Sequence, residues 1–240
     1  MNYNWNWGIL FEEPYFDWLV SGVEWTLFVS AIAWIIAFSL GSIVGVARTV
    51  DSVPIRAVAT AYVELFRNIP LIVQMFLWFY VVPEMVPDDL GRWMKRDMPF
   101  PEVTSAIFCL GTYTASRVAE QVRAGIESIP VGQRAAGLAM GLTTIQVYRY
   151  LLVPVGYRII VPPLTSEFLT IFKNSSLALT IGVAELLYQA RQIENYTFQG
   201  FEAFTSVTLI YLVLTMIVVA LMVRIEEKTK IPGYGIQKDK

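Results

Sequence analysis

The sequence contains no histidine and one cysteine, Cys109, among its 240 residues. Without these side chains the chain cannot build a histidine general base, a disulfide framework or an ordinary zinc site. Charge is also scarce, at 16% of residues, where a soluble domain carries about a quarter. A net charge of -2 gives no basis for nucleic-acid binding. These shortages direct attention to the 55% of residues that are hydrophobic.

Two familiar local signals are missing as well. The first residues, MNYNWNWGILFEEPYFDW, have neither a basic region nor a small-residue cleavage site, so we do not expect a signal peptide. The phosphate-binding pattern GxxxxGK[ST] does not occur, which excludes ATP binding by a P-loop in this chain. We therefore expect no catalytic residue, no bound metal and no cofactor on the chain itself.

Long uncharged runs indicate an all-α integral membrane protein. Residues 25–47 and 203–223 contain no charged side chain, and each run is long enough to cross a bilayer, which needs about 20 apolar residues. Gly41 and Gly45 form a GxxxG step in the first run. This step either allows close helix packing or reflects the general abundance of glycine in membrane helices.

Three further segments are apolar but interrupted. Segment 57–83 is long enough for a span only with its charged first half. Segment 103–121 is rich in small and hydroxyl residues, which favour contact between helices over exposure to lipid. Segment 151–187 contains prolines at 154, 162 and 163 that should break or kink a helix. The sequence thus predicts about five transmembrane helices.

The distribution of lysine and arginine predicts the orientation of these spans, because basic residues concentrate on the cytosolic side. Residues 1–23 contain no lysine or arginine. Most of the 18 basic residues fall in three stretches that would share the opposite side: Arg48, Arg56, Arg67, Arg117, Arg123, Arg134, Arg149, Arg158, Arg224, Lys228, Lys230, Lys238 and Lys240. We expect a periplasmic N-terminus, a cytosolic C-terminus and a location in the bacterial inner membrane.

Residues 132–154, GQRAAGLAMGLTTIQVYRYLLVP, have the pattern of two short helices joined by a glycine turn. Pro130 suits a helix start, Gly141 suits a left-handed helix end, and Thr143 with Gln146 has capping-box spacing. A helical hairpin between membrane spans is suited to contact with a partner outside the lipid. The alternative is an amphipathic connector lying on the membrane surface.

Three motifs carry a resemblance to a known family. Residues 132–154 resemble the cytosolic signature of importer-type ABC permeases, with Ala135, Ala136 and Gly137 at the EAA positions, Gly141 as the fixed glycine and Pro154 as the later proline. FRNIPLIVQ at residues 66–74 and KNSSL at residues 173–177 resemble two signatures of the polar amino-acid branch. Their shared order and spacing make the combination more specific than any one motif.

The resemblance implies a type I ABC importer permease fold over residues 19–225, preceded by a periplasmic segment at 1–18 and followed by a cytosolic tail at 226–240. It implies a coupling region at about 128–150, whose ATPase-coupling residues would be Gly132, Gln133, Arg134, Ala135, Ala136, Gly137, Gly141 and Leu142. Ala135 departs from the family pattern, which has glutamate there. This departure suggests docking that depends more on shape, beside a second, non-identical permease that keeps the acid.

The same resemblance implies the other subunits of an import complex. Two ATP-binding subunits carrying ATP and magnesium would dock on the hairpins, and a periplasmic binding protein would deliver the substrate. The sequence is most similar to permeases for glutamate and aspartate uptake, which makes an ATP-driven glutamate/aspartate importer the leading expectation. A permease for glutamine, arginine or histidine remains an alternative.

Charged side chains inside a span are functional candidates, because each costs about 2.5–3.5 kcal/mol to insert. Lys173 and Glu167 are such cases, and they would lie about 120° apart on an ideal helix. We expect Lys173 to meet a substrate carboxylate, Glu167 an ammonium group, and Asn174, Ser175 and Ser176 the remaining hydrogen bonds. The structural alternative is that Lys173 and Glu167 neutralise each other or contact backbone carbonyls.

Two other classes of protein fit parts of the pattern. A non-transporting scaffold could use the hairpin to recruit a cytosolic protein, but the polar KNSSL segment argues against it. A stand-alone channel or secondary carrier should show internal repeats and several membrane acids, and the sequence shows no such repeat.

Overall fold

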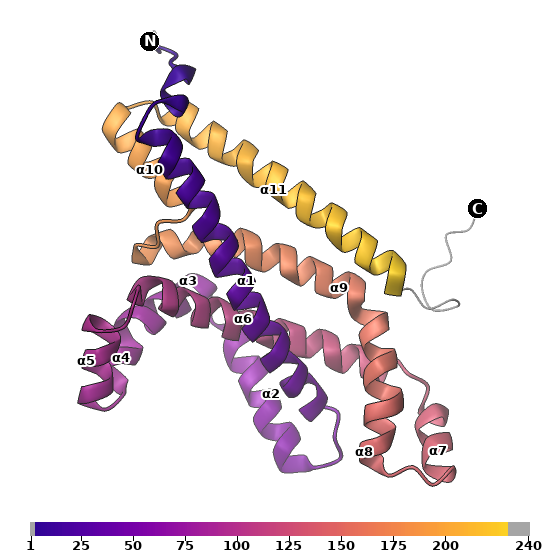
Figure 1. The fold of residues 1–240 in the computed structure, drawn as a ribbon. Coiled ribbons are helices and arrows are strands. Elements are labelled where there is room, and N and C mark those ends of the chain that lie inside the picture. Colours follow the sequence, from indigo (N-terminus) through magenta and orange to yellow (C-terminus); the bar gives the residue numbers. More distant parts are fainter. Residues whose placement is uncertain (1–2, 230–240) are drawn as a thin grey trace. The chain divides into compact units, whose positions relative to one another are not determined.

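The computed structural model describes residues 3–229, which contain helices and no strand, as the all-α prediction requires (Figure 1). The helices form two compact units. Unit 1 comprises the chain up to Ile35, Ile69–Gly111 and Leu169–Val218. Unit 2 comprises Ile36–Asn68, Thr112–Phe168 and the chain from Val219 onward. Each unit is described by itself below.

The elements follow one another along the colour gradient of Figure 1. In chain order they are η1 (Trp7–Phe11), α1 (Tyr15–Ala47), α2 (Val53–Asn68), α3 (Leu71–Phe76), η2 (Leu77–Val81), α4 (Val82–Met85), α5 (Asp88–Arg96), α6 (Pro101–Glu127), α7 (Val131–Ala139), α8 (Thr144–Val147), η3 (Tyr148–Leu152), α9 (Val153–Asn174), η4 (Ser175–Ile181), α10 (Leu186–Thr197) and α11 (Gly200–Thr229). The segments η2 and η3 are π-helical, whereas η1 and η4 are 3₁₀ helices.

The first and last predicted spans correspond to long apolar helices. Within the described residues, α1 with 33 residues and α11 with 30 are long and apolar enough to cross a membrane on their own. Helix α2 and the chain from Leu71 to Met85 meet that requirement only as a broken pair. The predicted segment 57–83 is therefore divided at Ile69 and Pro70. The proline ring clashes with the backbone of the residue before it and disfavours the helical conformation there.

The two middle segments are long helices whose surfaces are less apolar. Helix α6 has 27 residues and buries the small and hydroxyl side chains Ser105, Thr114 and Ser116. This burial agrees with the prediction that the segment faces other helices rather than lipid. Helix α9 has 22 residues. A total of five spans stays a prediction.

Of the two outcomes expected at Pro162 and Pro163, a break or a kink, the structure excludes the break. Helix α9 contains both prolines and continues to Asn174. A proline removes the hydrogen bond of a single N–H group, and in membrane helices packing against neighbours compensates for this loss. Ile160 and Leu164, on either side of the prolines, are both buried. The helix ends instead where it tightens into η4, at whose C-terminus Gly182 has φ of 94°.

Glycine allows helices of unit 2 to approach closely. A Cβ atom added to Gly41 or Gly45 of α1 would lie 2.6 Å from the Cβ of Val118 or Val122 on α6. A Cβ on Gly125 of α6 would lie 2.9 Å from the carbonyl oxygen of Gly156 on α9. Real side chains do not approach so closely, so only glycine fits. The GxxxG step in the first span is thus a packing device.

A buried carboxylate organises the start of α10 in unit 1. Glu185 is fully buried and caps the helix by accepting the N–H groups of Leu187 at 3.0 Å and Tyr188 at 2.8 Å. The hydroxyl of Tyr211 on α11 donates to the same carboxylate at 2.7 Å, and the N–H of Leu186 donates to Thr26 of α1 at 3.1 Å. Since all these groups are satisfied, burial of the charge is tolerated.

Replacing Gly45 by alanine tests the close contact in unit 2. We expect Gly45→Ala to lower the free energy of unfolding by about 1–3 kcal/mol, because the added methyl group overpacks the contact with Val122. Thermal unfolding of the purified protein in detergent, followed by tryptophan fluorescence, measures the change. Gly8→Ala is the matched control, since its nearest neighbour is 3.4 Å away. Equal effects of both variants would contradict the packing role.

Candidate functional site

The predicted hairpin is present and its caps are formed as expected. Pro130 precedes α7, and Gly141 has φ of 87°, in the left-handed region that glycine tolerates. The N–H of Gln146 donates to Thr143 Oγ1 at 3.3 Å, and the N–H of Thr143 donates to Gln146 Oε1 at 2.8 Å. These reciprocal bonds constitute the predicted capping box at the start of α8.

The hairpin is packed on its inner side and apolar on its outer side. Gly137 and Val147 are buried against each other, so that a Cβ on Gly137 would lie 3.1 Å from Val147 Cγ2. By contrast, Val131, Met140 and Ile145 are 82%, 76% and 79% exposed. Large apolar side chains with this exposure on a short rigid motif are typical of a protein-contact surface.

The sequence-predicted coupling residues divide according to this inner and outer side. Gly137 is buried, and Arg134 and Leu142 are partly buried. The other members of the predicted set are exposed: Gly132, Gln133, Ala135, Ala136 and Gly141. The two exposed alanines, Ala135 and Ala136, lie on α7, the first helix of the hairpin.

Two contacts attach the hairpin to the loop that follows α1. Arg134 Nη2 lies 2.5 Å from Asp51 Oδ2, and the hydroxyl of Tyr148 donates to the carbonyl oxygen of Thr49 at 2.7 Å. Arg134 therefore has a structural partner within the chain, which its sequence position did not reveal.

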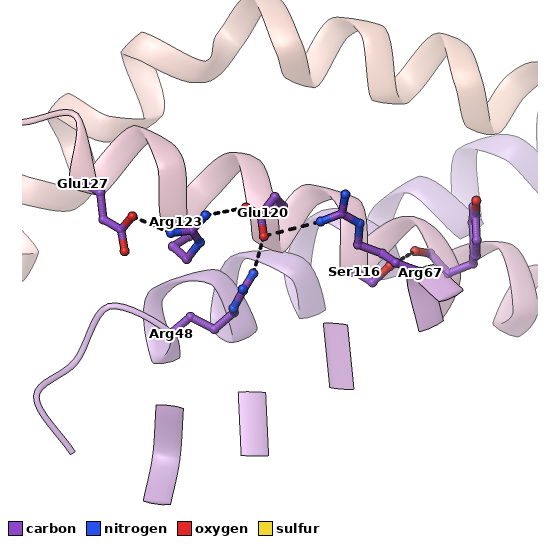
Figure 2. Close-up of polar contacts among 7 residues, drawn as sticks. Arg48, Arg67, Ser116, Glu120, Arg123 and Glu127 are labelled. Atoms are coloured by element: carbon purple, nitrogen blue, oxygen red, sulfur yellow. Dashed lines mark hydrogen bonds and ion pairs between the residues drawn. The ribbon is translucent and has the colours of Figure 1, made fainter. Parts of the chain in front are cut away.

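One carboxylate of α6 joins this helix to the C-terminal ends of α1 and α2 in unit 2 (Figure 2). Glu120 of α6 is paired with Arg48, which follows α1, and with Arg123 Nη2 at 2.5 Å. Arg67 Nη1 on α2 lies 3.6 Å from the same Glu120 oxygen that pairs with Arg48. Arg123 also contacts Glu127 Oε2 at 2.5 Å. We call these five residues the Glu120 cluster.

Only part of this cluster is predictable from the sequence. The spacings of Arg123 from Glu120 and Glu127, three and four residues along one helix, are readable in advance. The approach of Arg48 and Arg67 is not, because it depends on which faces of α1 and α2 contact α6. Removing Glu120 would leave three arginines with one carboxylate, so the cluster depends on this residue.

Glu167 does not pair with Lys173, which was the structural alternative to a contact of both residues with substrate. Glu167 is buried and receives a two-pronged contact from Arg117 of α6, at 2.6 Å from Nε and 3.2 Å from Nη2. Lys173 is exposed near the end of the helix, and Asn174 is partly buried. Ser175 and Ser176 donate their hydroxyl hydrogens to the carbonyl oxygens of Phe172 and Lys173, at 2.7 and 2.8 Å.

Arg117 is a further candidate, although from its place in the sequence it served only to indicate orientation. It lies inside segment 103–121, which was itself predicted to cross the membrane, and this position was the available signal. A two-pronged arginine–carboxylate contact fixes the plane of the guanidinium group. With a side chain 38% exposed, Arg117 retains donors that can face a further acceptor.

Comparison with known proteins identifies the class to which this arrangement belongs. Residues 37–231 match the family described as "Binding-protein-dependent transport system inner membrane component". The chain belongs to this family, and it is a membrane permease subunit of an ABC importer. This result confirms the resemblance carried by the three motifs.

Two individual relatives are similar to this chain over most of its length. The glutamate/aspartate import permease protein GltJ of Escherichia coli strain K12 is 45% identical, over 97% of this chain and 98% of the relative. The probable glutamine ABC transporter permease protein GlnM of Bacillus subtilis strain 168 is 33% identical, over 88% and 92%. Both relatives match almost end to end.

Solved structures confirm the type I importer permease fold. A chain of the crystal structure of an amino acid ABC transporter with histidines aligns with a TM-score of 0.78 at 28% identity, covering 95% of this chain and 100% of that one. The inward-facing MetNI methionine ABC transporter aligns with a TM-score of 0.74, at 23% identity and with coverage of 92% and 100%. At that identity the second likeness supports the fold alone.

Removing the central carboxylate tests the Glu120 cluster. We expect Glu120→Ala to lower the free energy of unfolding by about 2 kcal/mol, between the values for exposed and buried ion pairs, because arginines that shared it then repel one another. Chemical or thermal unfolding of the purified protein provides the measurement. Glu64→Ala, which removes an exposed carboxylate of α2, should change stability by less than about 0.5 kcal/mol. A loss of similar size in both variants would argue against the cluster.

Proposed function

We propose that the chain is the transmembrane pathway subunit of an ATP-driven importer for glutamate and aspartate in the bacterial inner membrane. The observation that carries this proposal is 45% identity to a glutamate/aspartate import permease over 97% of the chain. Cationic side chains within predicted spans, Arg117 and Lys173, suit substrates with two carboxylates. The apolar, exposed surface of the α7–α8 hairpin suits a partner protein.

The proposed complex contains further subunits. Two ATP-binding subunits supply the ATP–magnesium sites, since the chain has no P-loop of its own. A second permease completes the pathway, and we propose a non-identical one because Ala135 replaces the acidic residue of the coupling signature. A periplasmic binding protein delivers the amino acid on the side of the N-terminus, and the hairpin and C-terminus face the cytosol.

Coupling in this proposal proceeds through the hairpin. The exposed side chains of Met140 and Ile145 dock on the ATP-binding subunit, with Gly132, Gln133, Ala135 and Ala136 forming the adjacent surface. Closure of the ATP-binding subunits moves the hairpin, and the Arg134–Asp51 and Tyr148–Thr49 contacts transmit the movement to the loop after α1. ATP binding thereby biases an equilibrium between inward-facing and outward-facing states.

The proposed substrate contacts centre on the end of α9 and the start of η4. Lys173 supplies positive charge for a carboxylate, Asn174 supplies amide donors and an acceptor, and the hydroxyl oxygen of Ser176 can accept from the substrate ammonium. Ser175 is fully buried, so its hydroxyl supports the start of η4 by donating to Phe172. Glu167 acts differently from the initial expectation. Because its carboxylate already binds Arg117, we propose that it holds the guanidinium group of Arg117 in a fixed orientation.

The role of Lys173 is tested by uptake into proteoliposomes that contain the full complex and its binding protein. We expect Lys173→Ala to reduce glutamate and aspartate uptake at least about tenfold, because a charge-assisted contact to the carboxylate is lost. Competition by glutamate, aspartate, glutamine and arginine gives the selectivity. Lys228→Ala, at an exposed lysine of α11, should leave both unchanged.

Two results would contradict these assignments separately. Unchanged transport by Lys173→Ala would remove Lys173 from the pathway. Competition by glutamine as strong as that by glutamate would instead favour a glutamine permease, consistent with the 33% identity to GlnM.

The docking surface is tested by placing a charge on it. We expect Met140→Asp to reduce both co-purification of the ATP-binding subunit and ATP-dependent uptake about tenfold or more, because the carboxylate loses water in an apolar contact. Phe11→Asp is the matched control, since Phe11 is 78% exposed but lies outside the hairpin. Normal assembly of the Met140 variant would exclude this surface as the docking site.

A further inference from the structure

An apolar groove of about 660 Å³ opens in unit 1, between the first half of α1 and the chain that connects α5 to α6. Val103 and Ile107 of α6 line it and are buried. Phe28 and Trp93 also line the groove, and about half of each side chain is exposed. The size lies within the range of small-molecule sites, and neither the proposed pathway nor the hairpin accounts for the groove.

Aromatic rings form much of its wall. The ring of Trp25 lies 5.3 Å from that of Phe100 and 5.9 Å from that of Phe28, measured between centroids. Phe100 has φ of 48°, in the left-handed region that a bulky residue rarely adopts. The chain thus holds this ring in place at the cost of backbone strain, which argues for a defined surface rather than loose packing.

The groove also has a definite charge preference. Among its lining residues, Glu24 is the charged one, and it is exposed at the rim. Aromatic faces carry negative electrostatic potential and attract cations, ammonium groups above all. The carboxylate and the rings therefore favour the same kind of ligand group, while the apolar floor favours hydrocarbon.

The position of the groove suggests where such a ligand comes from. Glu24 directly precedes the uncharged run at residues 25–47 of α1, so the rim corresponds to the boundary between headgroups and hydrocarbon. Tryptophan is enriched at this depth. A molecule with an ammonium headgroup and an acyl chain satisfies the rim and the floor together.

We propose that this groove binds a phospholipid with a primary ammonium headgroup, phosphatidylethanolamine, with the headgroup against Glu24 and Trp25 and an acyl chain over Val103 and Ile107. The bound lipid fills the space between α1 and the segment that leads into α6. This proposal does not depend on which amino acid the permease transports.

Native mass spectrometry of the delipidated complex, with added phosphatidylethanolamine or phosphatidylglycerol, tests the proposal. We expect Glu24→Gln and Trp25→Ala each to weaken phosphatidylethanolamine binding about fivefold, since each removes an attraction for the ammonium group. Binding of phosphatidylglycerol should not change. Glu12→Gln and Phe11→Ala, at exposed positions outside the groove, serve as controls. Equal affinity for the two lipids, or insensitivity to Glu24→Gln, would overturn the proposal.

A cysteine substitution distinguishes lipid from protein as the occupant. The native Cys109 is buried, so Trp93→Cys introduces an accessible thiol at the groove. We expect added phosphatidylethanolamine, and not phosphatidylglycerol, to slow its reaction with a water-soluble maleimide. We also expect no cross-link to another subunit when the assembled complex is treated with a short bifunctional maleimide. A cross-link to the second permease or to the binding protein would show that protein covers the groove and would overturn the lipid assignment.

Discussion

Close contact between α1 and α6 is the constraint on which the rest of unit 2 depends. The absence of side chains at Gly41 and Gly45 allows the backbones to approach, and this approach places Arg48 against Glu120. Glu120 in turn gathers Arg123 and lies near Arg67 (Figure 2). A packing feature of the membrane helices thus determines an electrostatic feature at their ends, because arginine can reach a carboxylate only where the helices are close.

The same end of α1 leads into the loop that holds the hairpin. Asp51 and Thr49 bind Arg134 and Tyr148, so two contacts join the hairpin to the chain between α1 and α2. In the proposed importer, this attachment converts movement of a docked ATP-binding subunit into movement of the transmembrane helices. Exposed apolar residues provide the contact, while buried Gly137 and the capping box keep the hairpin rigid.

Charges inside predicted spans follow a common physical rule in this chain. A buried carboxylate is tolerated when it is hydrogen-bonded, and Glu167 meets this condition through Arg117, as Glu185 does through two backbone groups and Tyr211. By contrast with Glu167, the side chain of Lys173 on the same helix is exposed. This difference is why we assign Glu167 to positioning and Lys173 to direct contact with substrate.

The sequence by itself determined the all-α class, the first and last membrane helices, the hairpin with its caps and the family, because these depend on local composition, spacing and turn chemistry. Only the tertiary structure decided that Arg117 pairs with Glu167, 50 residues away, and that Glu120 joins three helices. It also decided that α9 continues through Pro162 and Pro163. Such outcomes depend on which faces of the helices are in contact. The spacing of residues in the sequence shows which side chains share one face of a helix, but it does not show which other helix that face contacts.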